Sequence, residues 1–101
     1  MIKVRITAMK KVCHADLSEK YENPIEHACE IEEGAVFISE NGEMPEGFCR
    51  EAWKSVGEFA AALAYGEENF FDGWMKDPKS AMISCNDGFR PVSFYIEAVK
   101  E

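Results

Sequence analysis

The sequence contains no C-x-x-C pair, no long apolar run and few basic residues. Its four cysteines are isolated, whereas structural zinc and iron–sulfur sites usually have cysteines paired at short spacing. No apolar segment approaches the length of a membrane span, and the first residues alternate apolar and basic side chains where a signal peptide needs a continuous apolar segment. We therefore expect a cytoplasmic protein without a membrane partner, whose cysteines are free thiols or metal ligands rather than disulfides.

The shortage of basic residues limits the choice of partners. Lys and Arg number 11 against 19 Asp and Glu, which gives a formal net charge of -8. Binding to nucleic acid needs clustered cations to neutralise phosphates, so no nucleic-acid partner is expected. The 101 residues, 47% of them hydrophobic, suffice for one domain with a true core, and we assign residues 1–101 to a single domain.

Residues 44–66 carry the strongest helical pattern in the chain. Cys49 stands at the predicted N-terminus of the helix, and Gly66 suits the left-handed position that ends it. Apolar side chains recur there at helical spacing and predict a core-facing stripe: Ala52, Trp53, Val56, Phe59, Ala60 and Leu63. Polar residues fall on the other side: Arg50, Glu51, Lys54, Ser55 and Glu58.

The remaining segments predict strands around this helix. Residues 2–12 alternate as a half-buried strand, and a surface helix of one or two turns is expected before Asn23-Pro24. Residues 35–39 are apolar on both sides, which predicts a strand covered on both faces. Residues 80–85 and 91–99 form a hairpin in which Gly88 would supply a positive φ. The fold class is therefore α+β, a small, mostly antiparallel sheet of about four strands packed on or curled around one main helix.

Cys49 is the main candidate for chemistry. Backbone N–H groups and the helix dipole at an N-terminus stabilise a thiolate, which favours nucleophilic, redox or metal-binding use. Cys29 precedes one strand and Cys85 ends another, so three cysteines can converge into a metal or redox site. The alternative is that Cys49 is a small buried hydrophobe. His14 and His27 lie in polar surroundings typical of solvated surface histidines, although either would complete a Cys/His site.

Four further residues are candidates for ligand binding. Arg90 would suit a carboxylate at the mouth of a pocket, or would form a surface ion pair. Asp87 can orient a ligand, but its place in the hairpin turn already explains it. Trp53 and Trp74, with the neighbouring phenylalanines, would line a pocket beside Cys49 or would simply form the core.

Three motifs resemble those of a family of short, uncharacterised bacterial and archaeal proteins. They are G-F-C-R-E-A-W, W-M-K-D-P and C-N-D-G-F-R-P-V-S-F, and the resemblance extends over nearly the whole chain. After the cysteine that corresponds to Cys29 the family has proline, whereas this sequence has Glu30. By resemblance, the motif positions are Cys29, Cys49, Cys85, Asp87, Gly88, Arg90 and Pro91. The resemblance implies no particular reaction.

Two hypotheses follow for function. In the first, Cys49, Cys85 and Cys29 form a redox or metal-binding site beside an aromatic pocket, which would take a small-molecule ligand. In the second, a non-enzymatic binding or assembly module keeps its cysteines in the core. An enzyme with a cysteine nucleophile ranks third, because no residue is placed as its base. We expect no cofactor unless the cysteines bind a metal ion. We also expect a homodimer, in which the aromatic loop 70–75 or a sheet edge meets its copy.

Overall fold

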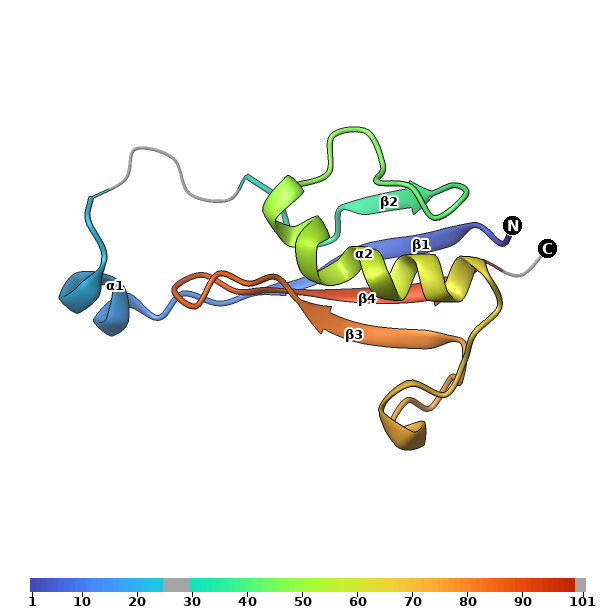
Figure 1. Ribbon diagram of the computed structural model, residues 1–101. Helices are drawn as coiled ribbons and strands as arrows, with labels where there is room; N and C mark the ends of the chain where they lie inside the picture. Colours follow the sequence, from blue (N-terminus) through green and yellow to red (C-terminus); the bar gives the residue numbers. More distant parts are fainter. Residues whose placement is uncertain (25–29, 100–101) are drawn as a thin grey trace.

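The computed structural model describes residues 1–24 and 30–99, which form a sheet of four strands and two α-helices (Figure 1). This confirms the α+β class predicted from the sequence. The elements in chain order are β1 (Val4–Lys11), α1 (Ala15–Tyr21), β2 (Val36–Ser39), α2 (Arg50–Ala64), a short 3-10 turn (Phe70–Gly73), β3 (Ser80–Ser84) and β4 (Val92–Ala98).

The sheet is antiparallel throughout, with strand order β2-β1-β4-β3. The first and last strands therefore lie together at its centre, where Ile6 pairs with Ile96. Alternation sends every second side chain of β1 and β4 to the face beneath α2, and these residues are completely buried: Val4, Ile6, Ala8, Val92, Phe94 and Ile96. The core thus lies between one face of the sheet and α2.

Helix α2 crosses that face with the apolar stripe that the sequence predicts. Ala52, Val56, Ala60 and Leu63 are buried, whereas Trp53 and Phe59 are partly exposed at the margins of the stripe. Gly66 ends the helix with a φ of 91°. Its N–H donates to Leu63, and the next N–H, of Glu67, donates to Ala62, the pair of bonds that closes a helix with glycine in the left-handed region.

The prediction that the strand at residues 35–39 is covered on both faces is wrong. Val36 and Ile38 are 54% and 42% exposed, whereas Ser39 is buried. The reason is architectural, because β2 is an edge strand and α2 packs on the opposite face of the sheet. An apolar run in a strand therefore does not by itself require two covering layers.

The predicted hairpin forms, but its turn uses a side chain instead of a glycine. Gly88 is not among the described residues with positive φ, which corrects the expectation drawn from the sequence. Asp87 provides the geometry instead, because its Oδ1 accepts hydrogen bonds from the backbone N–H groups of Phe89 (2.8 Å) and Arg90 (3.1 Å). The turn interpretation of Asp87 is supported by these two bonds.

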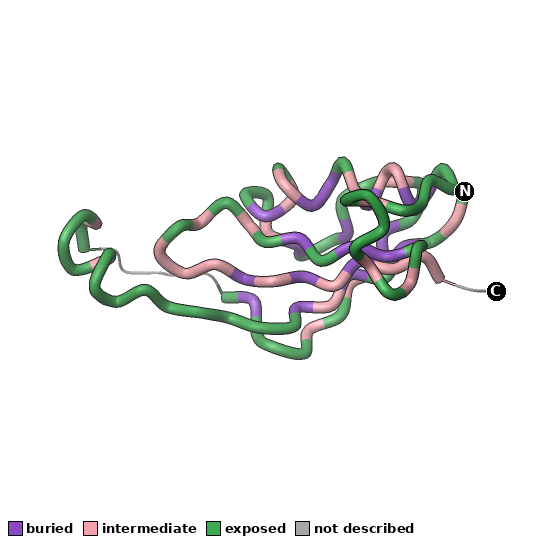
Figure 2. Tube along the Cα trace, turned by 90° about the horizontal axis from the view of Figure 1, so that it is seen from below, coloured by how far each residue is buried: buried purple, intermediate pink, exposed green. Residues whose placement is uncertain are grey.

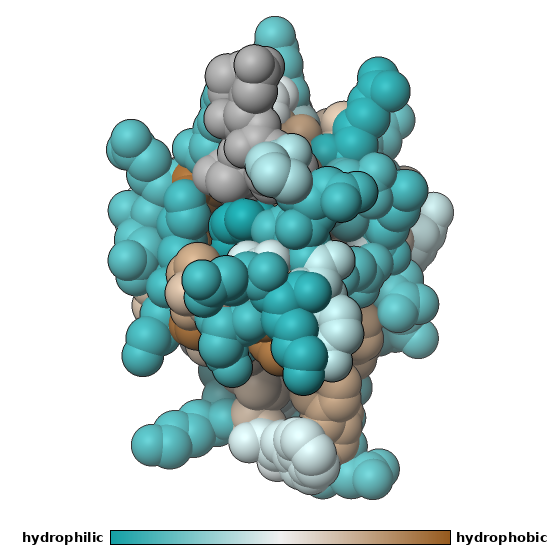
Figure 3. Space-filling view, turned by 90° about the vertical axis from the view of Figure 1, so that its left-hand side faces the viewer, coloured by the Kyte–Doolittle hydropathy of each residue, from teal (hydrophilic) through white to brown (hydrophobic). Residues whose placement is uncertain are grey.

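Two segments project from the body of the sheet (Figures 1 and 2). Helix α1, with all of its residues described and none of them buried, lies beyond one end of the strands. At that end the visible surface is mainly hydrophilic (Figure 3). The 3-10 turn projects past β3, where Phe70 and Phe71 pack against Phe59, with ring centroids 5.6 Å apart in both pairs. We call residues 67–78, which include this turn, the aromatic arm.

Candidate functional site

Cys49 lines a cavity at the N-terminal end of α2. The residue occupies the N-cap position with an extended backbone, and its partly buried side chain packs against the core. The cavity, about 580 Å³ in volume, lies between this helix end, β2 and the segment before β2. It is lined by Glu30, Ile31, Glu32, Ala35, Phe37, Gly47 and Cys49. Cys49 therefore borders a space with both apolar and acidic walls.

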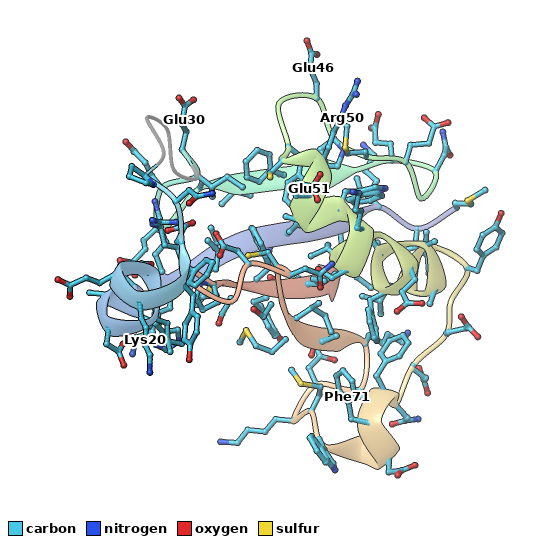
Figure 4. All side chains as sticks on the ribbon, turned by 60° about the vertical axis from the view of Figure 1, so that its left-hand side comes forward. Lys20, Glu30, Glu46, Arg50, Glu51 and Phe71 are labelled. Carbon is cyan, nitrogen blue, oxygen red and sulfur yellow. The ribbon has the colours of Figure 1, made fainter. Side chains whose placement is uncertain are left out.

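The charged side chains around this end of α2 come from three segments. Figure 4 shows Glu30 before β2, Glu46 in the loop between β2 and α2, and Arg50 and Glu51 in the first turn of α2. Glu30 and Glu46 point away from the sheet. The first-turn position of Glu51 is favourable for the helix dipole, and its carboxylate also pairs with Lys54 at 3.1 Å. A ligand of the cavity would therefore enter past acidic groups.

Cys85 is held by the hairpin rather than presented to a ligand. Its Sγ accepts a hydrogen bond from the backbone N–H of Val92 at 3.3 Å, and its own N–H donates to the carbonyl of the same residue at 3.0 Å. The side chain is partly buried against the core. This geometry gives Cys85 a structural explanation that does not depend on a ligand.

The proposed metal set is only partly within the described residues. Cys29 and His27 lie outside them, and the three described cysteines, Cys13, Cys49 and Cys85, are free thiols. Within residues 1–24 and 30–99 no three His, Cys, Asp or Glu side chains are grouped to hold a metal ion. A metal site with three such ligands would therefore need at least one residue from outside the described ranges.

Arg90 is occupied by a carboxylate of its own chain. Its Nη1 and Nη2 donate to the two carboxylate oxygens of Glu22 at 3.0 and 2.5 Å, so the pair is bidentate. The hydrogen bond from Arg90 lowers the pKa of Glu22 below its ordinary value, and the same bond raises the pKa of Arg90. The pair links the end of α1 to the β3–β4 hairpin and borders a second cavity, of about 560 Å³, which also includes Cys13.

Sequence reasoning missed Glu22, because nothing local identifies its partner. It belongs to a polar stretch before Asn23-Pro24, and Arg90 lies in the distant hairpin. Of the two alternatives for Arg90, a ligand carboxylate or an ion pair within the chain, the structure contains the ion pair. Glu22 therefore takes two of the five N–H donors of the guanidinium.

The two tryptophans do not share a pocket. Trp53 lies in α2, one turn from Cys49, and packs edge-on against Phe48 with ring centroids 5.8 Å apart. Trp74 is 81% exposed in the aromatic arm and contacts Phe71. In Figure 4 the arm, marked by Phe71, lies far from the cluster of labelled charges around the cavity. Of the aromatic residues considered for a ligand pocket, the structure brings only Trp53 near Cys49.

Comparisons with known protein families, with curated proteins and with solved structures found no match. The family resemblance therefore stays a prediction. Among the described residues no helix is long and apolar enough to cross a membrane.

Proposed function

We propose that this chain is a small cytoplasmic binding protein with a redox-active thiol, and that Cys49 and its cavity are the centre. The observation that carries the proposal is the position of the thiol. Cys49 lines a cavity of about 580 Å³ at the N-cap of the one long helix in the described chain. Ile31, Ala35 and Phe37 supply an apolar wall for a small molecule.

The chemistry we propose is exchange with a disulfide. The Cys49 thiolate attacks one sulfur of a small disulfide ligand, and a new S–S bond forms between them. The original S–S bond breaks, and the other half of the ligand leaves as a thiolate that takes a proton from water. This step needs no base from the protein, in keeping with the absence of a placed base in the sequence.

Labelling with 2,2′-dipyridyl disulfide tests the proposal, because this reagent is neutral, aromatic and small enough for the cavity. We expect Cys49 to react at least about ten times faster than the exposed Cys13, because the apolar wall of the cavity would hold the aromatic reagent beside Cys49. Cys49→Ser should abolish this fast phase of labelling, whereas Cys13→Ser should retain it. Iodoacetamide, which has no aromatic ring, should discriminate less between the two thiols. Preferential reaction of Cys13 with both reagents would reject the proposal.

The metal-binding form of the same hypothesis adds Cys85 and Cys29 as ligands. Elemental analysis of protein purified without oxygen distinguishes it from the redox form. Stoichiometric zinc or iron that is lost in Cys29→Ser, Cys49→Ser and Cys85→Ser alike would support the metal form. Metal-free protein with a fast Cys49 phase supports the thiol form.

A second candidate is a non-enzymatic binding or assembly module in which the cysteines are core residues. The hydrogen bond from Val92 to the Cys85 sulfur favours this interpretation for Cys85. Under this alternative, each cysteine-to-serine change would alter stability without changing any binding. The labelling experiment separates the two candidates, because a core thiol reacts only when the domain unfolds.

A further inference from the structure

The sheet face opposite α2 carries apolar side chains in contact with solvent. Val36, Ile38 and Met82 project from this face and are 54%, 42% and 45% exposed. Helix α2 packs on β1, β3 and β4 from the other side (Figure 1). Exposed apolar groups on one face of a sheet are a typical feature of a contact surface.

The strand register places these side chains in two rows across the sheet. In the first row Thr7 pairs with Val36 on one side and with Tyr95 on the other, and Tyr95 pairs with Met82. This row crosses all four strands, in the order Val36, Thr7, Tyr95, Met82. The second row runs through Ile38, Arg5, Glu97 and Ser80, of which Ser80 is buried. The Arg5 Nη1 lies 3.6 Å from the Glu97 Oε2.

These rows are complementary to their own copies. The order β2-β1-β4-β3 puts β1 and β4 at the centre and the other two strands at the edges. A two-fold axis parallel to the strands, between two stacked sheets, brings β1 of one copy over β4 of the other. Arg5 then faces Glu97 of the second copy, and Glu97 faces its Arg5. In the other row Val36 faces Met82, so apolar groups meet at both ends.

We propose that this face is the contact surface of a homodimer in which two sheets stack around such an axis. The choice of a second copy follows from the charges. In the second row each copy offers one cation, Arg5, and one anion, Glu97, so opposite charges meet twice across the axis. Isologous contacts of this kind close on themselves and give a dimer. The proposal is independent of the Cys49 chemistry, because the cavity is bounded by the helix side of the sheet.

The packing also agrees with ordinary sheet geometry. Two sheets that stack face to face lie about 10 Å apart, with side chains of the two inner faces interdigitating. Thr7 and Tyr95 would meet at the centre, where the tyrosine supplies a large contact area. Each monomer would then have its sheet covered on both faces, by α2 and by the partner.

Charge reversal on each side of the axis tests the proposal. Arg5→Glu places four carboxylates around the axis, and Glu97→Arg places four guanidinium groups there. We expect each variant alone to raise the dissociation constant of the dimer at least about ten-fold, because like charges then face each other at close range. An equimolar mixture of the two variants should form a heterodimer, since both carboxylates of the first variant then face guanidinium groups of the second. Light scattering on a sizing column and native mass spectrometry measure both effects.

The mixture distinguishes loss of the contact from damage to the fold. Residues 5 and 97 of the same chain carry like charges in both variants, so mixing the two restores attraction only between chains. Lys54→Glu, on the exposed side of α2, is the matched control and should leave the dimer intact. Wild-type protein that is monomeric at tens of micromolar would overturn the proposal. So would a mixture that fails to associate. Loss of the dimer in Trp74→Ser together with its survival in Arg5→Glu would assign the contact to the aromatic arm instead.

Discussion

The indole of Trp53 lies over Gly57, one turn later in α2. A Cβ at position 57 would be 2.8 Å from Cε2 of the ring and 2.9 Å from Nε1, closer than atoms can approach without displacement. Gly57 is buried, and its lack of a side chain gives the indole its place against the helix. The ring can then also reach Phe48, which it contacts edge-on. Gly57, which interrupts the helical pattern, thus positions the ring of Trp53, the first aromatic residue of α2.

Gly57→Ala should therefore destabilise the protein although alanine is the better helix former. The helix gains about 0.5–1 kcal/mol from the change in propensity, whereas overpacking typically costs about 1–3 kcal/mol. We expect a net loss of about 1 kcal/mol in the free energy of unfolding, measured by denaturant titration. The loss should disappear in a Trp53→Leu background, which removes the clash. A stabilised single variant would mean that the indole moves aside freely.

Truncation of Phe94 should be more damaging than truncation of Trp53. Phe94 is completely buried at the centre of the sheet and packs against Phe48, with ring centroids 5.3 Å apart. We expect Phe94→Ala to cost about 3–5 kcal/mol, and Trp53→Ala less, because that side chain is partly exposed. Cys85→Ser should cost less than either. The reverse order of Phe94 and Trp53 in denaturant titrations would place the centre of the core at the end of α2 instead.

The ion pair between Glu22 and Arg90 should make stability depend on pH on the acid side. Hydrogen bonding from Arg90 lowers the pKa of Glu22 below its ordinary value of 4.5, so the stabilising contribution is present above that value. It is lost as the pH falls through the lower pKa of the folded state. Glu22→Gln should reduce stability at neutral pH, and the difference from wild type should vanish in acid.

A double-mutant cycle is the control for this pair. In an Arg90→Gln background, Glu22→Gln should no longer change the pH profile. Because the pair joins α1 to the hairpin, hydrogen exchange in α1 should also increase in the single variant. An unchanged profile and unchanged exchange would show that the pair contributes nothing to the position of α1.

Asp87→Ala should loosen the hairpin turn. The change removes the acceptor for the N–H groups of Phe89 and Arg90, and we expect a loss of about 1–2 kcal/mol in the free energy of unfolding. Asp87→Asn keeps an acceptor oxygen and should lose much less. Equal losses in the two variants would mean that the charge, not the acceptor geometry, is what the turn requires.

Periodicity was enough to predict the elements that lie in one clear environment. The stripe of α2 and the alternation of β4 follow from burial on one side only, and both are as expected. The hairpin follows from the turn residues between two alternating segments. In each case the signal is local, because the pattern needs only the neighbours along the chain.

The errors concern features that local patterns do not determine. Val36 and Ile38 look like core residues, but their exposure depends on the edge position of β2 and on which face α2 covers. The turn at residues 86–90 could be formed by a positive φ at Gly88 or by hydrogen bonds to the Asp87 side chain, and the structure uses the hydrogen bonds. The pairing of Arg90 with Glu22 joins segments that are distant in sequence, and the place of Trp74 depends on the path of the whole arm.

The central position of β1 and β4 also affects how the chain reaches its folded state. Val4 pairs with Ala98, so the middle of the sheet joins the two ends of the described chain. Pairing across such a separation closes a large loop and is slow compared with the formation of α2 or the β3–β4 hairpin. On a ribosome, β1 must wait without its main partner until β4 has been synthesised. Its alternating apolar side chains are therefore exposed longest, and β1 is the segment for which protection by a chaperone would matter most.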